Sequence, residues 1–71
     1  MEEMWEVMRK VEKKNKGLLC KFSIYLHTES GDIPLAVGTY DVLAHVFVPS
    51  MFQREVVEVI EHQTHTTIII K

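Results

Sequence analysis

Apolar residues at the start of the chain recur with the spacing of one helix face. They are Met1, Met4, Trp5, Met8 and Val11, with Val7 at the margin. A period of 3.6 residues is typical of an amphipathic helix that packs one stripe against a core. Glutamates open the segment and basic residues close it, which suits the helix macrodipole, and Gly17 provides a stop. The pattern predicts a helix over residues 2–16.

Residues 18–28 alternate between apolar and polar side chains. The apolar positions of this stretch are Cys20, Phe22, Ile24 and Leu26. Alternation of this kind predicts a strand with one buried face. The segment 29–32 has the composition of a tight turn, in which Gly31 can take positive φ. Alternation resumes at Ile33, Leu35 and Val37, so we expect residues 19–28 and 33–40 to pair as a hairpin.

The stretch 41–48 fits two interpretations. Its β-branched content favours a third strand. Asp41, placed as an N-cap, would instead start a short helix. Gly38 interrupts the pattern before this stretch and Pro49 ends it. We expect the strand.

Residues 51–62 have the features of a second amphipathic helix. Ser50 and Gln53 have the spacing of a capping box, in which two side chains bond the first turn of a helix. The apolar positions of one helical face are Phe52, Val56, Val59 and Ile60. We therefore expect a helix over residues 51–62.

The chain ends in a strongly β-forming segment, residues 65–71. Three consecutive isoleucines, Ile68–Ile70, leave no polar face, which is typical of a central strand or of one sealed by a partner. The element order is then α-β-β-(β)-α-β. It predicts a single α+β domain over residues 1–71, with an antiparallel or mixed sheet of three to four strands and two helices on one face.

Composition narrows the class of protein. Seventy-one residues allow one domain, and 46% hydrophobic content is typical of a globular chain. No leader-like segment and no apolar run of membrane-spanning length is present, so we expect a soluble protein of the cytoplasm. Cys20 is the single cysteine, which excludes an internal disulfide and suggests a reducing compartment. A core this small predicts that the chain associates with a second copy.

Charge is unevenly distributed beneath a formal net charge of −2. Residues 9–21 carry a net charge of +5, and the residues after them carry −4. The basic segment could follow a nucleic-acid backbone, with an aromatic side chain for base stacking. The residues of this alternative site are Arg9, Lys10, Lys13, Lys14, Lys16, Lys21 and Tyr25. A pI near 6.0 and the lack of a nucleic-acid-binding motif weigh against it.

The acidic residues suggest a different partner. On the predicted second helix, Glu55, Glu58 and Glu61 would form an outer ridge, and we place Asp41 with them as a partner-binding face. An acidic ridge of this kind suits a basic protein, including one that itself binds nucleic acid.

Residue types that could support catalysis or metal binding do not form a recognised pattern. His62 and His65 are three positions apart, and Cys20 or His27 could join them, but the spacing of a zinc site is missing. Cys20 lies in phase with the apolar side of its strand and should be unreactive. We expect no catalytic residues, no cofactor and no metal, and hence no enzyme.

These patterns together predict a small protein-interaction module. We expect a homodimeric regulator or inhibitor of a larger protein, of a kind often encoded by phages and mobile elements; a nucleic-acid-binding module is the alternative. The dimer interface is expected to use the apolar positions at the two ends of the chain. They are Met4, Trp5, Met8, Ile68, Ile69 and Ile70.

Overall fold

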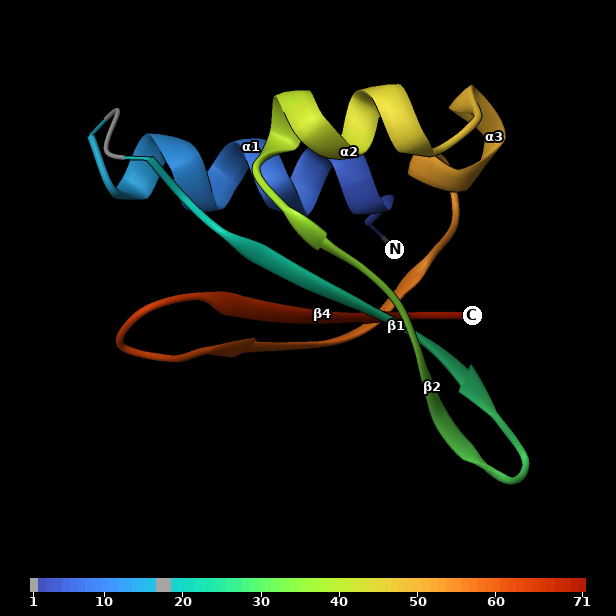
Figure 1. Cartoon of the computed structure of the whole chain (residues 1–71). Coiled ribbons are helices and arrows are strands. Elements are labelled where there is room, and N and C mark those ends of the chain that lie inside the picture. Colours follow the sequence, from blue (N-terminus) through green and yellow to red (C-terminus); the bar gives the residue numbers. More distant parts are fainter. Residues whose placement is uncertain (1, 17–18) are drawn as a thin grey trace.

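A computed structural model describes residues 2–16 and 19–71, which form a helical layer over a sheet (Figure 1). Within these residues there are three helices: α1 (Met4–Lys14), α2 (Tyr40–Val46) and α3 (Pro49–Phe52). The strands are β1 (Phe22–Thr28), β2 (Gly31–Gly38), β3 (Val56–Glu61) and β4 (Thr66–Ile70). The helices share one face of the sheet, so the predicted α+β architecture is confirmed. Three positions of these predictions lie outside the described residues: Met1 of the apolar stripe, Gly17 at the end of the first helix, and Leu18 at the start of the alternating stretch.

Two hairpins meet at the middle of the sheet. The strand order is β2-β1-β4-β3, with β1–β2 and β3–β4 antiparallel and β1–β4 parallel. The predicted hairpin is confirmed, and Gly31 in its turn has a φ of 124°. The isoleucine run forms a central strand, as predicted. Ile68 and Ile70 face the helices, whereas Ile69 faces the other side and is only 7% exposed.

The core lies between α1 and the two central strands. Its buried residues are Met4, Val7, Met8, Val11, Phe22, Ile24, Leu43, Ile68 and Ile70. The apolar stripe of the first helix is thus confirmed for Met4, Met8 and Val11, but Trp5 is 42% exposed. Trp5 follows Met4 by one position, a rotation of about 100° on a helix with 3.6 residues per turn. That rotation places its ring at the flank of α1.

The apolar residues of β2 lie outside this core. A β-bulge between Ile24 and Tyr25 shifts the register, so that Ala36 packs against the core while Val37 is 61% exposed. The tip of the hairpin extends beyond the helical layer (Figure 1). Ile33, near that tip, is therefore half exposed.

The face of the sheet opposite the helices has no helix over it within the described residues (Figure 1). Residues that pair directly across neighbouring strands point to the same face, so the register identifies the side chains on this side. They are Ser23, Tyr25, His27, Asp32, Pro34, Val37, Glu58, Ile60, Thr67 and Ile69, and we call them the open face.

Most of the stretch 41–48 lies in the helix α2, and the expectation of a strand was wrong. The helix α2 begins after Thr39, whose Oγ1 accepts a hydrogen bond from the Val42 N–H at 3.4 Å. The short-helix alternative was therefore correct, with Thr39 rather than Asp41 as the N-cap. Leu43 is the buried anchor of the helix. Local β propensity is weak enough for one buried contact and a cap to override it.

The predicted helix over residues 51–62 is also wrong. A single turn, α3, ends at Phe52, and residues 56–61 form the edge strand β3. Two backbone hydrogen bonds attach the start of β3 to the N-terminal segment. The Val56 N–H donates to the Glu2 carbonyl at 2.9 Å, and the Met4 N–H donates to the Arg54 carbonyl at 2.9 Å. Helix α1 is the longest of the described helices, at 11 residues, and none is long and apolar enough to cross a membrane.

Candidate functional site

The described residues form an apolar pocket of about 320 Å³ in the helical layer, where α1, α2 and α3 meet. Its lining residues are Trp5, Tyr40, Ala44, Phe47, Pro49, Phe52 and Gln53. Four of these are aromatic, out of one Trp, two Tyr and three Phe in the whole chain. We call this site the aromatic pocket. A concave, largely apolar lining with few polar groups is typical of binding sites.

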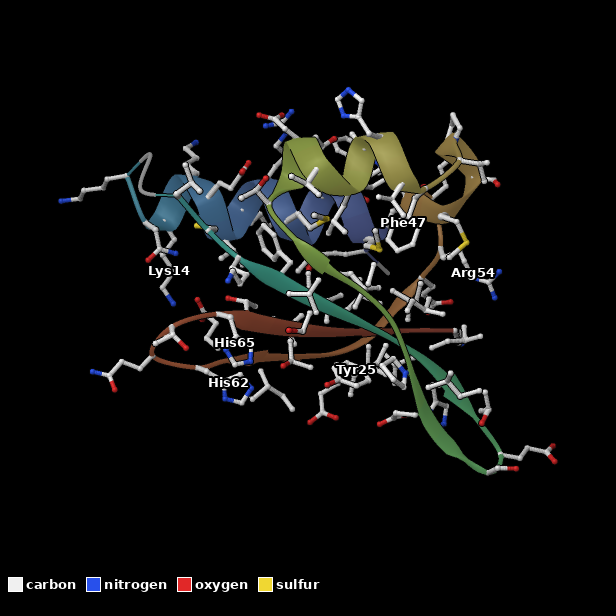
Figure 2. The ribbon with its side chains drawn as sticks, viewed as in Figure 1. Lys14, Tyr25, Phe47, Arg54, His62 and His65 are labelled. Carbon is white, nitrogen blue, oxygen red and sulfur yellow. The ribbon has the colours of Figure 1, made fainter. Side chains whose placement is uncertain are left out.

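Each helix contributes to the pocket through a local feature of its sequence. Trp5 stands on the flank of α1, and its Nε1–H donates to Glu3 Oε1 at 2.7 Å, which satisfies the indole and orients the ring. Pro49 occupies the first turn of α3, a position that suits its fixed φ. Phe47 ends α2 and lies close to α3 (Figure 2).

Ring contacts between α2 and α3 shape the pocket. Phe52 lies 5.5 Å from Tyr40 and 6.1 Å from Phe47, measured between ring centroids, with the second pair edge to face. Such pairs add about 0.5–1.5 kcal/mol each beyond the area they bury. The single turn α3 is therefore attached to α2 through Phe52, and the pocket opens between these rings and Trp5.

A cation lies beside the pocket. The Arg9 guanidinium carbon is 3.8 Å from the centroid of the Tyr40 ring, and Arg9 Nη1 donates to Glu12 Oε1 at 3.1 Å. The Arg9 side chain is nevertheless 58% exposed. A guanidinium carries five N–H donors, so Arg9 keeps donors that face solvent next to an aromatic wall.

The structure does not assemble the predicted nucleic-acid site. Lys10 pairs with Glu2, which raises the pKa of Lys10, and Lys14 pairs with Glu61 at 2.9 Å. Tyr25 lies on the open face, on the opposite side of the sheet from the helix that carries most of these bases. Lys13, Lys16 and Lys21 have no ion pair among the described residues.

The predicted acidic ridge is not formed either, because Glu58 and Glu61 lie on β3 rather than on a helix, and Glu55 directly precedes that strand. Glu55 pairs with Lys71 at 3.3 Å and Glu61 with Lys14, so two of its three carboxylates are matched within the chain. Glu58 belongs to the open face, and Asp41 lies in the first turn of α2. These four residues do not share one surface.

Most of the predicted dimer interface belongs to the core of the single chain. Met4, Met8, Ile68 and Ile70 are fully buried and present no surface to a second copy. Trp5 lines the aromatic pocket and Ile69 belongs to the open face. The structure thus separates these six residues into a core, a pocket and a sheet face.

A smaller, polar pocket of about 190 Å³ lies at the other end of the molecule. Cys20, His62 and His65 line it, and the two imidazole rings stack with centroids 4.4 Å apart (Figure 2). His62 Nε2 bonds Thr67 Oγ1 at 3.0 Å. Within residues 2–16 and 19–71, no three His, Cys, Asp or Glu side chains are arranged to hold a metal ion.

The thiol of Cys20 is expected to react slowly in the folded protein. Burial, followed by the nearby Glu12 carboxylate, raises the pKa of Cys20 above its ordinary value, so less thiolate is present at neutral pH. Alkylation of Cys20 in the folded protein should therefore accelerate at a higher pH than alkylation of Cys20 in the urea-unfolded chain. Mass-spectrometric timing of iodoacetamide labelling from pH 7 to 10 measures both profiles. Equal profiles for the two states would contradict the expected shift.

Pocket residues that the sequence analysis missed share one signal. Tyr40, Phe47 and Phe52 concentrate three of the six aromatic residues of the chain in a short stretch. We divided this stretch among the hairpin strand 33–40, the expected strand 41–48 and the start of the expected helix 51–62, so the cluster was not visible as one site.

No protein-family model, no curated protein and no solved structure matches this chain.

Proposed function

We propose that this chain is a protein-interaction module that performs no catalysis and binds a partner protein through the aromatic pocket. The observation that carries the proposal is the convergence of Trp5, Tyr40, Phe47 and Phe52 around one open cavity. Trp and Tyr are enriched among residues that dominate binding energy, and such residues gather in pockets near the centre of an interface.

The immediate surroundings of the pocket support this proposal. Val48, which lies in the chain between the lining residues Phe47 and Pro49, is 60% exposed. An exposed apolar side chain beside a pocket extends the area that a partner can cover. The role expected from the sequence, a small regulator or inhibitor of a larger protein, is kept in this proposal, with the aromatic pocket in place of the acidic ridge.

Selection from a random displayed peptide library tests the pocket directly. We expect selected peptides to shift the emission of Trp5, the single tryptophan of the chain. Ala44→Asp should abolish that shift by placing a charge in the apolar lining. His45→Asp is the matched control, because it puts the same charge at the same helix end on an exposed residue outside the lining. Equal binding by both variants would refute the proposal.

A homodimer remains part of the proposed function, with its interface moved to the open face. Ile60 and Val37 on this face are 38% and 61% exposed, and Ile69 lies between their strands. Light scattering at micromolar concentration should give a mass near twice the chain mass of 8.3 kDa. Ile60→Glu should yield the monomer, whereas Val42→Glu in the helical layer should not. A wild-type mass near that of one chain would exclude the dimer.

A further inference from the structure

Cationic side chains lie along one side of the aromatic pocket. Trp5, Arg9 and Lys13 follow each other at intervals of four residues, so they form one line along the exposed flank of α1. Arg9 lies on the Tyr40 ring of the pocket wall, and Lys13 continues the line without an ion pair among the described residues. Lys16, just after the helix, is a further base without an ion pair in the part of the chain that the structure describes.

Two of the acidic groups near the pocket already have partners. The Glu3 carboxylate accepts the Trp5 indole N–H, and the Glu12 carboxylate pairs with Arg9. Asp41 lies in the first turn of α2, where the helix macrodipole stabilises an anion. The remaining donors of Arg9 and the ammonium of Lys13 are thus cationic groups beside the pocket that the carboxylates of a partner could meet.

From this arrangement, and resting on the proposed function, we propose that the pocket takes an acidic segment of a partner protein. An aromatic or long aliphatic side chain of that segment enters between Trp5 and Phe52, and a neighbouring carboxylate binds the Arg9 guanidinium. Arg9 suits this role because its stacking on Tyr40 fixes the plane of the guanidinium, which can then meet a carboxylate through two parallel hydrogen bonds.

Two other occupants fit the charges less well. A basic segment would place its cations against Arg9 and Lys13. A second copy of this chain could offer the acidic, tryptophan-bearing residues 2–6, but Met4 there is fully buried and its N–H is bonded to Arg54. That segment is part of the fold and cannot leave it to fill a neighbouring pocket.

Titration of Trp5 emission with three synthetic peptides tests the proposal. Each peptide carries Phe and Leu at helical spacing and lacks Trp, and the positions between them are all Glu, all Gln or all Lys. We expect the Glu peptide to bind about tenfold more tightly than the Gln peptide, and the Lys peptide more weakly still. Added salt should reduce the difference between the peptides, because these charges are exposed.

Variants of α1 identify the cation responsible. Arg9→Gln should weaken binding of the Glu peptide about tenfold. Arg9→Lys should restore part of that loss, since it keeps the charge but not the paired hydrogen bonds. Lys10→Gln is the control, because it removes the same charge from a neighbouring residue that pairs with Glu2, whereas Arg9 stacks on the Tyr40 ring of the pocket.

The outcomes separate this inference from the function on which it rests. If the three peptides bind equally and Ala44→Asp abolishes binding of all of them, the pocket binds protein and its preference for acids is refuted. If no peptide shifts Trp5 emission and library selection also fails, the proposed function itself falls. If Trp5 emission changes with protein concentration alone, and Ala44→Asp prevents the change, a second copy fills the pocket and the acidic partner is excluded.

Discussion

Replacing Phe22 with alanine is expected to leave most of the chain unfolded at room temperature. Phe22 is fully buried at the start of β1, between Gly38 on one neighbouring strand and Thr66 on the other. Truncation of a buried phenylalanine costs about 3–5 kcal/mol. A single core in a chain of this size rarely supplies more than about 3–5 kcal/mol of total stability. The loss is therefore comparable to everything that holds the fold together.

Urea unfolding followed by far-ultraviolet circular dichroism measures this effect. Val37→Ala is the control, because Val37 lies on the edge strand of the same hairpin and is 61% exposed. Its effect should stay below about 1 kcal/mol. A cooperative transition for Phe22→Ala with nearly the wild-type midpoint would show that the core is not organised around this residue.

The elements that could be predicted from the sequence are those whose pattern has one structural interpretation. Met4, Met8 and Val11 recur at helical spacing, and all three lie on the buried side of α1 in the structure. The alternation of Phe22 and Ile24 with polar residues agrees with a strand that has one buried face. Ile68 and Ile70 occupy a central strand, which their unbroken apolar run indicated.

Residues 56–61 show why periodicity alone can mislead. Val56 and Val59 are three positions apart, as on one face of a helix. In a regular strand they would point to opposite faces, but a β-bulge between Val56 and Glu58 shifts the alternation by one residue. Both therefore face the helical layer, where Val56 pairs with Ile70 and Val59 pairs with Ile68 on the neighbouring strand. A bulged strand can thus imitate helical spacing, and the β-branched content of the segment was the better guide.

The aromatic pocket could not be predicted because it depends on how three helices meet. Trp5 was assigned to the buried stripe of α1, and only the packing of α2 against this flank shows that its ring lines a cavity. The turn α3 has four residues, too few to leave a periodic signal. Similarly, the ion pair of Lys14 with Glu61 joins residues 47 positions apart, so the sequence alone could not show which charges remain unmatched.

Gly38→Ala should destabilise the protein and disturb the pocket together. A Cβ atom at position 38 would lie 2.9 Å from Val42 Cγ1 and 3.2 Å from Val42 Cβ, both closer than ordinary contact. Because valine has little freedom at χ1, α2 itself would have to move, and Tyr40 and Ala44 would move with it. The clash should cost about 1–3 kcal/mol. Alanine also lowers the conformational entropy of the unfolded chain, which stabilises the folded protein by only about 0.4–1 kcal/mol. The free energy of unfolding should therefore decrease.

A double-mutant cycle with Val42→Ala establishes whether this contact is the cause. Val42 is 51% exposed, so its truncation alone should change the free energy of unfolding by only about 0.5 kcal/mol. In the background of Gly38→Ala the same truncation removes the closest atom, and we expect it to recover at least about 0.5 kcal/mol through the coupling of the two sites. Trp5 emission should return toward that of the wild type in the double variant, because α2 no longer needs to move. If the changes in the free energy of unfolding are strictly additive and Trp5 emission is still altered, Gly38 acts through the backbone of β2. The contact between Gly38 and Val42 would then not determine the position of α2.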